Sequence, residues 1–205
     1  MNIIIFGATG GVGQHAVKLA VDAGHNVTAF VRTPEKLNFT EGVTIIKGDA
    51  FDPQAVADAI AGHDAVMSCL GSSTGMKPSN DLERMGKNIA DGMKSHHVTR
   101  LVYCASAGVF GEIPGVAGKL MQWLLRNPLK DHKAALDYYL ANEQLNYTIA
   151  RPMGLKNEAF VENYQETFEG VPAKSTSIPR ACVAHFLVKA LSDEKYFNTS
   201  VGLAK

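Results

Sequence analysis

The sequence predicts an α/β fold: a doubly wound parallel sheet with helices on both of its faces. Three observations predict it. Apolar, β-rich runs alternate along the chain with segments whose apolar residues recur at helical spacing. Several of the β-rich runs are apolar on both faces, as strands buried between helices are. No long linker or low-complexity stretch divides the 205 residues, so we expect a single domain over residues 1–205.

The first part of the chain is expected to hold four strands, over Asn2–Phe6, Val27–Val31, Val43–Lys47 and Ala65–Cys69. The apolar positions of Val12–Ala23 fall on one helical face, and Gly24 is expected to end that helix. Asp52 reads as an N-cap with Pro53 in the first helical position, and Gly62 as the stop of this second helix.

The second part holds a further helix and three further strands. Asn80 and Glu83 have the spacing of a capping box, and apolar residues recur at helical spacing from Leu82 to Met93. Strands are expected over Arg100–Cys104, Tyr147–Ala150 and Thr199–Leu203. Parallel sheets of this kind bind ligands beyond the carboxyl ends of their strands, so the loops there are candidate sites.

Composition excludes several classes of function. Lys+Arg and Asp+Glu both number 20, so the net charge is zero and any recognition of charge must be local. We therefore expect no nucleic-acid or membrane partner. The three cysteines form no CxxC pair, which favours buried thiols over a metal site or a disulfide framework. The N-terminus has no signal-peptide pattern, so a cytoplasmic monomer or homodimer is expected.

Three glycines spaced by three, Gly7, Gly10 and Gly13, follow the first strand in the stretch "IIIFGATGGVG". The helix is expected to open near Gly11 or Val12, and a helix N-terminus presents unpaired N–H groups to an anion. Gly10 would let the backbone approach a pyrophosphate, and Gly13 would let the helix pack close to the strand. The alternative is a tight turn without a ligand. No Gly-Lys-Ser/Thr follows, which argues against an NTPase.

The end of the second strand bears on which dinucleotide is bound. Arg32 stands where NAD-binding proteins place an acid, and Lys36 lies nearby. Because an arginine binds a 2′-phosphate that an acid would repel, this pattern favours NADP(H) over a merely solvated arginine. Asp49 and Ala50 follow the third strand, where an acid can bind the adenine amino group, although Asp49 could equally cap its turn. Small residues after the fourth strand, Gly71 and Ser72, suit close approach to the cofactor.

Five motifs in this order, "GATGGVG", "VRTPEKL", "GDAFDP", "VYCASAG" and "YTIARPMGL", resemble the atypical short-chain dehydrogenase/reductase proteins. The likeness is greatest to the small NAD(P)H-binding group that includes the NADPH-dependent flavin reductase, also called biliverdin reductase B. It implies a Rossmann-type sheet, NADP(H) as cofactor and hydride transfer to a flat conjugated acceptor. It also implies an acceptor-site region at about residues 107–130 and 152–178.

The resemblance assigns roles to single residues. The cofactor contacts are expected at Gly7, Thr9, Gly10, Gly11, Val12, Gly13, Arg32, Asp49, Leu70, Gly71 and Cys104. Ser106 stands at a common active-site position after the fifth strand. Arg151, Pro152 and Met153 stand where the family has residues beside the nicotinamide.

The acid of tyrosine-dependent members is missing. In the pattern Tyr-x-x-x-Lys, Lys133 matches the lysine, but Leu129 stands in place of the tyrosine. Ser106 would serve as a hydrogen-bond donor, and His132 could titrate near neutrality, although a helical histidine beside a lysine is more often a surface or cap residue. Tyr138 and Tyr139 are expected to pack against the sheet.

Reduction of a ketone needs a positioned acid, whereas a flavin delocalises the charge that hydride transfer creates. The expected function is therefore an NADPH-dependent reductase of a flavin, a biliverdin-like tetrapyrrole or a quinone, each a small-molecule acceptor. The apolar segment Val109–Lys130, with Trp123, is expected to be a lid over that acceptor or plain packing, and we favour the lid. One alternative is an NmrA-like redox sensor that binds NADP with little catalysis. Another is a nucleotide-sugar epimerase, which the short region after Pro152 disfavours.

Overall fold

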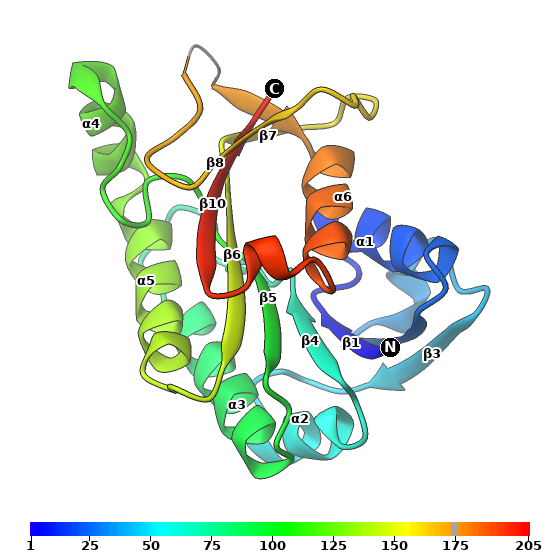
Figure 1. The fold of residues 1–205 in the computed structure, drawn as a ribbon. Coiled ribbons are helices and arrows are strands. Elements are labelled where there is room, and N and C mark those ends of the chain that lie inside the picture. Colours follow the sequence, from blue (N-terminus) through cyan, green and yellow to red (C-terminus); the bar gives the residue numbers. More distant parts are fainter. Residues whose placement is uncertain (174–175) are drawn as a thin grey trace.

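The computed structural model describes residues 1–173 and 176–205 and contains an eight-stranded sheet in the order β3-β2-β1-β4-β5-β6-β10-β8 (Figure 1). The pairs are parallel except β10 with β8. A small parallel pair, β7 with β9, lies beside it. The strands are β1 Asn2–Phe6, β2 Asn26–Val31, β3 Val43–Lys47, β4 Ala65–Ser68, β5 Arg100–Cys104, β6 Asn146–Pro152, β7 Gly154–Lys156, β8 Gln165–Thr167, β9 Ser177–Pro179 and β10 Thr199–Ala204.

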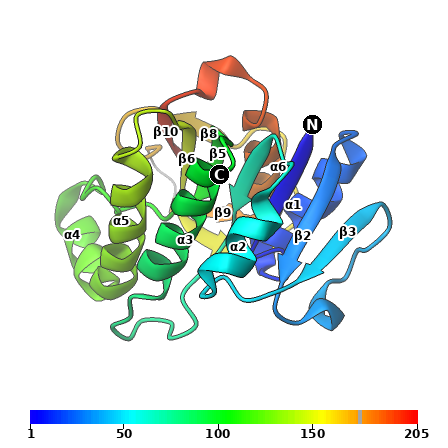
Figure 2. The ribbon, with the colours of Figure 1, turned by 90° about the horizontal axis from the view of Figure 1, so that it is seen from below.

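Helices cover both faces of the sheet (Figures 1 and 2). Alternate β1 residues point to opposite sides: Ile3 and Ile5 pack with α1 and α6, whereas Ile4 and Phe6 pack with α2, α3 and α5. The helices are α1 Gly11–Asp22, α2 Pro53–Ile60, α3 Asp81–Ser95, α4 Gly115–Leu124, α5 Arg126–Leu140 and α6 Arg180–Ala190, with short 3₁₀ turns at Pro34–Lys36 and Glu194–Tyr196. The predicted doubly wound fold is confirmed.

The helix ends predicted at Asp52, Gly24 and Gly62 are confirmed, and α3 begins directly after Asn80, but without the predicted capping box. The Asp52 carboxylate accepts hydrogen bonds from the N–H groups of Gln54 and Ala55, at 3.0 and 3.2 Å, as an N-cap does. Gly24 and Gly62 both have positive φ after their helices, which glycine adopts without strain. The capping box at Asn80 is wrong, because the Asn80 side chain makes no cap bond to α3.

A buried carboxylate from another helix caps α3 instead. Asp131 of α5, which is 2% exposed, accepts from the N–H of Glu83 at 3.0 Å and from the Ser79 hydroxyl at 2.6 Å. The cap is therefore made across the helix pair. It fixes the first turn of α3 and the end of the preceding loop against α5.

A buried arginine joins the core to the C-terminal end of α6. The Arg100 guanidinium donates to the carbonyl oxygens of Ala190, Leu191 and Asn146 and to the Thr148 hydroxyl. Burial lowers the pKa of Arg100 to about 10, so it remains charged at neutral pH. The orphan carbonyls at the end of α6 are thus satisfied by a cation.

Within residues 1–173 and 176–205, no helix has the length and apolar character needed to cross a bilayer. Over the same residues, no three histidine, cysteine or carboxylate side chains gather as a metal site would require.

Candidate functional site

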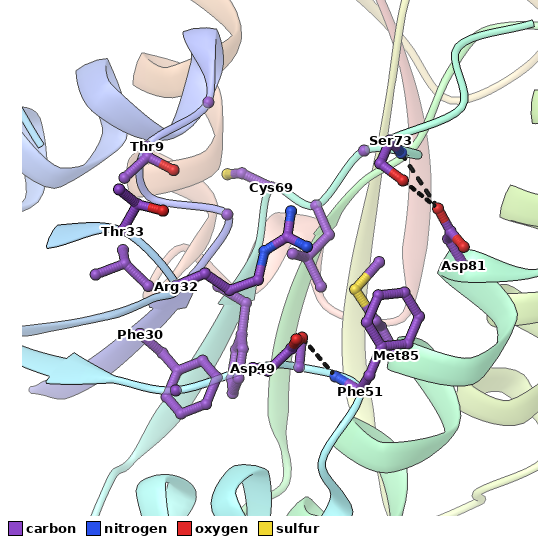
Figure 3. Close-up of a pocket in the computed structure, with 18 of the residues that line it drawn as sticks. Thr9, Phe30, Arg32, Thr33, Asp49, Phe51, Cys69, Ser73, Asp81 and Met85 are labelled. Atoms are coloured by element: carbon purple, nitrogen blue, oxygen red, sulfur yellow. Dashed lines mark hydrogen bonds between the residues drawn. The ribbon is translucent and has the colours of Figure 1, made fainter. Parts of the chain in front are cut away.

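A cavity of about 310 Å³ opens where the loops after β1, β2, β3 and β4 meet. These strands are neighbours in one parallel sheet, so their carboxyl ends share an edge. Figure 3 shows the side chains that converge there. Many of the residues predicted to bind a cofactor border the cavity: Gly7, Thr9, Gly10, Arg32, Lys36, Asp49, Ala50, Leu70, Gly71 and Ser72.

The first two glycines of the loop after β1 have different tasks. Gly7 has φ +74°, and a Cβ there would lie 2.5 Å from the carbonyl carbon of Cys69. It therefore serves the turn and the contact with the loop after β4. Gly10 has an ordinary φ of −77° and is the N-cap of α1. Because it has no side chain, the first turn of α1 is left without a side-chain cap. Its open side borders the cavity, and a Cβ there would come no closer than 3.2 Å to the protein.

The next two glycines serve packing. A Cβ on Gly13 would lie 2.1 Å from the carbonyl oxygen of Gly7, so only glycine lets α1 approach the loop this closely. A Cβ on Gly11 would meet the Cδ and Nε atoms of Arg180 at 2.7 Å. The Arg180 side chain, from the first turn of α6, thus lies over the N-terminus of α1. The sequence analysis did not identify this arginine, because its neighbour is 169 residues away in the sequence.

Two cations from the end of β2 reach the cavity. The Arg32 side chain crosses it between Asp49 and Cys69 (Figure 3). Lys36 follows in the 3₁₀ turn, whose position is fixed by Gln14 of α1. The Gln14 amide donates to the Lys36 carbonyl at 2.6 Å and accepts from the Asn38 N–H at 2.9 Å. The helix that carries the glycine loop therefore also orients the basic turn, a link that the sequence analysis missed.

An acid and an apolar wall lie beside Arg32 in the cavity. Asp49 lines the cavity, and its carboxylate also accepts from the Phe51 N–H at 3.1 Å, so both interpretations of this residue fit the geometry. Phe30, Phe51 and Met85 supply the apolar wall (Figure 3). Such a surface suits the faces of a purine ring, and Asp49 suits its amino group.

The loop after β4 forms the remaining wall and is held by hydroxyl groups. Ser73 donates to the Asp81 carboxylate from both its N–H and its hydroxyl, at 3.3 and 2.8 Å (Figure 3). The Ser72 hydroxyl lies 3.0 Å from that of Ser79, which donates to the buried Asp131. The wall is thereby fixed to both α3 and α5.

A family model described as NAD(P)H-binding matches residues 7–194, which include every residue that lines this cavity except Phe6. The chain belongs to the NAD(P)H-binding family. This confirms the resemblance drawn from the five sequence motifs.

Individual relatives of this NAD(P)H-binding protein carry different names. It is 35% identical over 114 residues to a 2-alkyl-3-oxoalkanoate reductase of Stenotrophomonas maltophilia, covering 53% of this chain and 34% of the relative. It is 27% identical over 158 residues to the photosystem II assembly factor Ycf39 of Synechocystis, covering 75% of this chain and 45% of the relative. The chain thus spans less than half the length of these two relatives.

A solved structure agrees over the whole chain. The Rossmann-fold NAD(P)-binding family protein from Shigella flexneri superimposes with a TM-score of 0.78 at 28% identity. The match covers 100% of this chain and 93% of that one. This supports the Rossmann-like arrangement seen in the sheet order.

None of the three predicted catalytic residues of this NAD(P)H-binding protein borders the cavity. Lys133 is partly exposed on α5 and forms an ion pair with Asp137. The Ser106 hydroxyl donates to the Ala107 carbonyl at 3.3 Å. His132 Nδ1 lies 2.8 Å from the Tyr103 hydroxyl. Their catalytic roles therefore stay predictions.

The expectation that His132 titrates near neutrality is wrong. Burial lowers its pKa to about 4, although the neighbouring Asp131 opposes that shift. Burial also raises the pKa of Tyr103, so Tyr103 keeps its proton and donates to Nδ1 of a neutral imidazole. Of the two tyrosines on the same helix, Tyr139 packs against Tyr103 as expected, whereas Tyr138 is exposed.

The cysteine that borders the cavity is Cys69 rather than Cys104. Cys104 is buried beside it, and burial raises its pKa to about 12. Val12, Pro152 and Met153 also lie outside the cavity lining, as do Gly11 and Gly13. Their side chains or backbones support the loop and strand ends around it.

Arg151 is turned into the protein. Its guanidinium pairs with Glu112 at 2.6 Å and donates to the Gly170 carbonyl at 2.7 Å. It therefore ties β6 to both parts of the expected acceptor region, 107–130 and 152–178, of which residues 174–175 lie outside the described chain. Trp123 is 60% exposed on α4, so the interpretation of Val109–Lys130 as plain packing is wrong for this helix.

Proposed function

We propose that this protein is an NADPH-dependent reductase of a flat conjugated acceptor such as a flavin, a biliverdin-like tetrapyrrole or a quinone. The observation that carries the proposal is the Arg32 side chain, which enters the cavity from the end of β2 where an NAD-specific site would hold an acid. The reductase among its relatives supports an oxidoreductase, and the nature of the acceptor rests on this chain's own residues.

The residues of the cavity fit an NADP(H) molecule. The first turn of α1 has no acid and no side-chain cap, so its N–H groups are available to a pyrophosphate beside Gly10. Arg32 and Lys36 would hold the 2′-phosphate, and Asp49 the adenine amino group. When bound, the cofactor would supply the hydride.

The acceptor class follows from the proton donors. Leu129 replaces the tyrosine, His132 is neutral and bonded to Tyr103, and Lys133 is paired with Asp137. A developing alkoxide would gain no acid from these groups, which disfavours ketones and aldehydes. A reduced flavin or quinone spreads its charge over a ring and can take its proton from solvent. We expect Ser106 to orient the acceptor by one hydrogen bond.

Oxidation of NADPH in the presence of a panel of acceptors tests this function. Flavin, biliverdin and soluble quinones should each be compared with simple ketones and aldehydes, with absorbance of NADPH as the readout. Turnover confined to the conjugated acceptors is the expected result. Turnover of ketones at an equal rate would contradict the proposal.

A second candidate is a non-catalytic NADP-binding regulator. It is favoured by the position of Ser106, His132 and Lys133 outside the cavity, and by a relative that is named an assembly factor rather than an enzyme. Tight NADP(H) binding without turnover of any acceptor, together with capture of a protein partner only when NADP is present, would support this candidate over the reductase.

A further inference from the structure

Helix α4 turns a continuous apolar face to solvent. Successive residues of an α-helix are rotated by about 100°, which brings the side chains of Val116, Leu120, Met121, Trp123 and Leu124 onto one side. Their exposed fractions are 86, 58, 49, 60 and 40%. We call these five residues the α4 apolar face. Figure 1 shows α4 standing out from the rest of the fold, beyond the N-terminal end of α5.

The opposite side of α4 makes the contacts with the protein. Gly118 is buried, and a Cβ there would lie 2.7 Å from the carbonyl oxygen of Ile113. This side of the helix is thus packed against Ile113, in the segment that leads into it, and the Gln122 amide also donates to the Ile113 carbonyl at 3.3 Å. An amphipathic helix normally buries its apolar side. Here the apolar side is the outward one, which marks an interaction surface.

Two cations lie at this face, although the chain as a whole is neutral. Lys119 belongs to α4 itself and is exposed, and α4 contains no acid. Lys133 is paired with Asp137, and Lys130 lies beside Asn80 and Glu83 at the start of α3, so neither adds free charge to this face. The Arg126 guanidinium lies 4.7 Å from the centre of the Trp123 ring, at the edge of the apolar face.

We propose that the α4 apolar face docks shallowly into an anionic lipid surface, with Lys119 and Arg126 among the headgroups. Apolar side chains with a tryptophan on one side and cations at the rim are the composition of helices that lie in a membrane interface. The helix has 10 residues, too few to cross a bilayer. This is the local recognition of charge that a neutral chain permits, and it is an alternative to the expectation of no membrane partner, which stays a prediction.

A second copy of the chain fits the same face less well. A two-fold contact through α4 would place the Lys119 and Arg126 cations of both copies in one interface, and like charges brought together at an interface are unfavourable. A lipid surface with negative headgroups instead neutralises them. The proposal does not depend on the proposed reductase function, because no residue of the α4 apolar face borders the cofactor cavity.

Vesicle binding by the full chain tests the proposal. Trp123 is the only tryptophan, so its fluorescence reports directly on the face. With vesicles that contain phosphatidylglycerol, we expect its emission to shift to the blue and the protein to float with the lipid. With phosphatidylcholine alone we expect neither effect, and added salt should release the protein from the anionic vesicles.

Two pairs of variants separate the apolar and charged contributions. Leu120→Ser should weaken flotation at least tenfold, whereas Leu140→Ser, at an exposed leucine near the end of α5, should leave it unchanged. The double variant Lys119→Glu and Arg126→Glu should weaken binding at least about 30-fold, because each lysine or arginine near an anionic surface contributes about 1 kcal/mol. The matched double variant Lys94→Glu and Lys47→Glu changes the net charge equally and should bind as the wild type does.

Circular dichroism and NADPH binding would verify that each variant is folded. Failure of the wild type to float with anionic vesicles would overturn the proposal, as would flotation that the Leu120→Ser change does not reduce. Sedimentation that shows a dimer of the wild type and a monomer of Leu120→Ser would also overturn it and assign the face to a second copy.

Discussion

Replacing Arg32 by alanine should weaken NADPH binding about tenfold or more and leave NADH binding within about twofold. The two cofactors differ only in the 2′-phosphate, and Arg32 is the side chain that crosses the cavity from the end of β2. A hydrogen bond to a charged group contributes about 1.5–3 kcal/mol. Because Arg32 is exposed, we take a value just below this range, about 1.4 kcal/mol, which corresponds to a factor of ten.

Fluorescence titration of both cofactors, for the wild type and for Arg32→Ala, measures this difference. Lys36 remains in the cavity of the variant, so we expect NADPH still to bind better than NADH at low ionic strength. Lys47→Ala, at an exposed lysine at the end of β3 that does not border the cavity, is the matched control. Equal loss of NADPH and NADH affinity in Arg32→Ala, or equal affinities in the wild type, would refute the assignment of this arginine to the 2′-phosphate.

Three further predictions concern the loop, the buried histidine and the buried cap. Gly13→Ala should prevent normal folding, since its Cβ would lie 2.1 Å from a backbone oxygen. Gly10→Val should fold, as judged by circular dichroism, but should lose NADPH binding. Retained NADPH binding would show that Gly10 serves only the turn. The pKa of His132 is about 4 when folded against an ordinary value of 6.5, so the unfolded chain binds the extra proton. The free energy of unfolding should therefore fall by up to about 3 kcal/mol as pH drops from about 6.5 to 4. His132→Asn should flatten this dependence in urea unfolding, and flavin reduction should show no steep limb between about pH 6 and 8. Asp131→Ala should lower the free energy of unfolding by about 1–3 kcal/mol, because two donors lose their acceptor. The control Asp137→Ala, at an exposed aspartate, should lower the free energy of unfolding by at most about 0.5 kcal/mol. Equal effects of the two variants would contradict the cap across the helices.

Local patterns in the sequence predicted the sheet and half of the site. The boundaries of the first, third and fifth strands agree with the predicted ones. The first and fifth are buried on both faces and therefore read as continuous apolar runs, whereas the third is a largely exposed edge strand. The glycine loop and Arg32 were also predicted from the sequence to lie at one site, since each stands at a fixed distance from a strand end, and both border the cavity. These signals lie within a few residues of the structure that they specify.

What the sequence did not predict depends on contacts between distant segments. Asp131 caps a helix that begins 50 residues earlier, and Asn80 offered a local capping signal that the fold does not use. Gln14 fixes the turn of Lys36 from another element. His132 is neutral because it is buried. Its neighbours in the sequence, Asp131 and Lys133, are charged and gave no sign that the histidine would be buried. Only the assembled fold shows these relations.

The buried guanidinium of Arg100 has a consequence for how the molecule opens. Its donors are satisfied only when the starts of β5 and β6 and the end of α6 are all in place. A partly opened state that released α6 alone would leave a cation in the core without acceptors, which is costly. Amide hydrogens in α6 should therefore exchange with solvent at the same rate as those of the central strands, so that the chain's C-terminal helix and its sheet unfold as one cooperative unit.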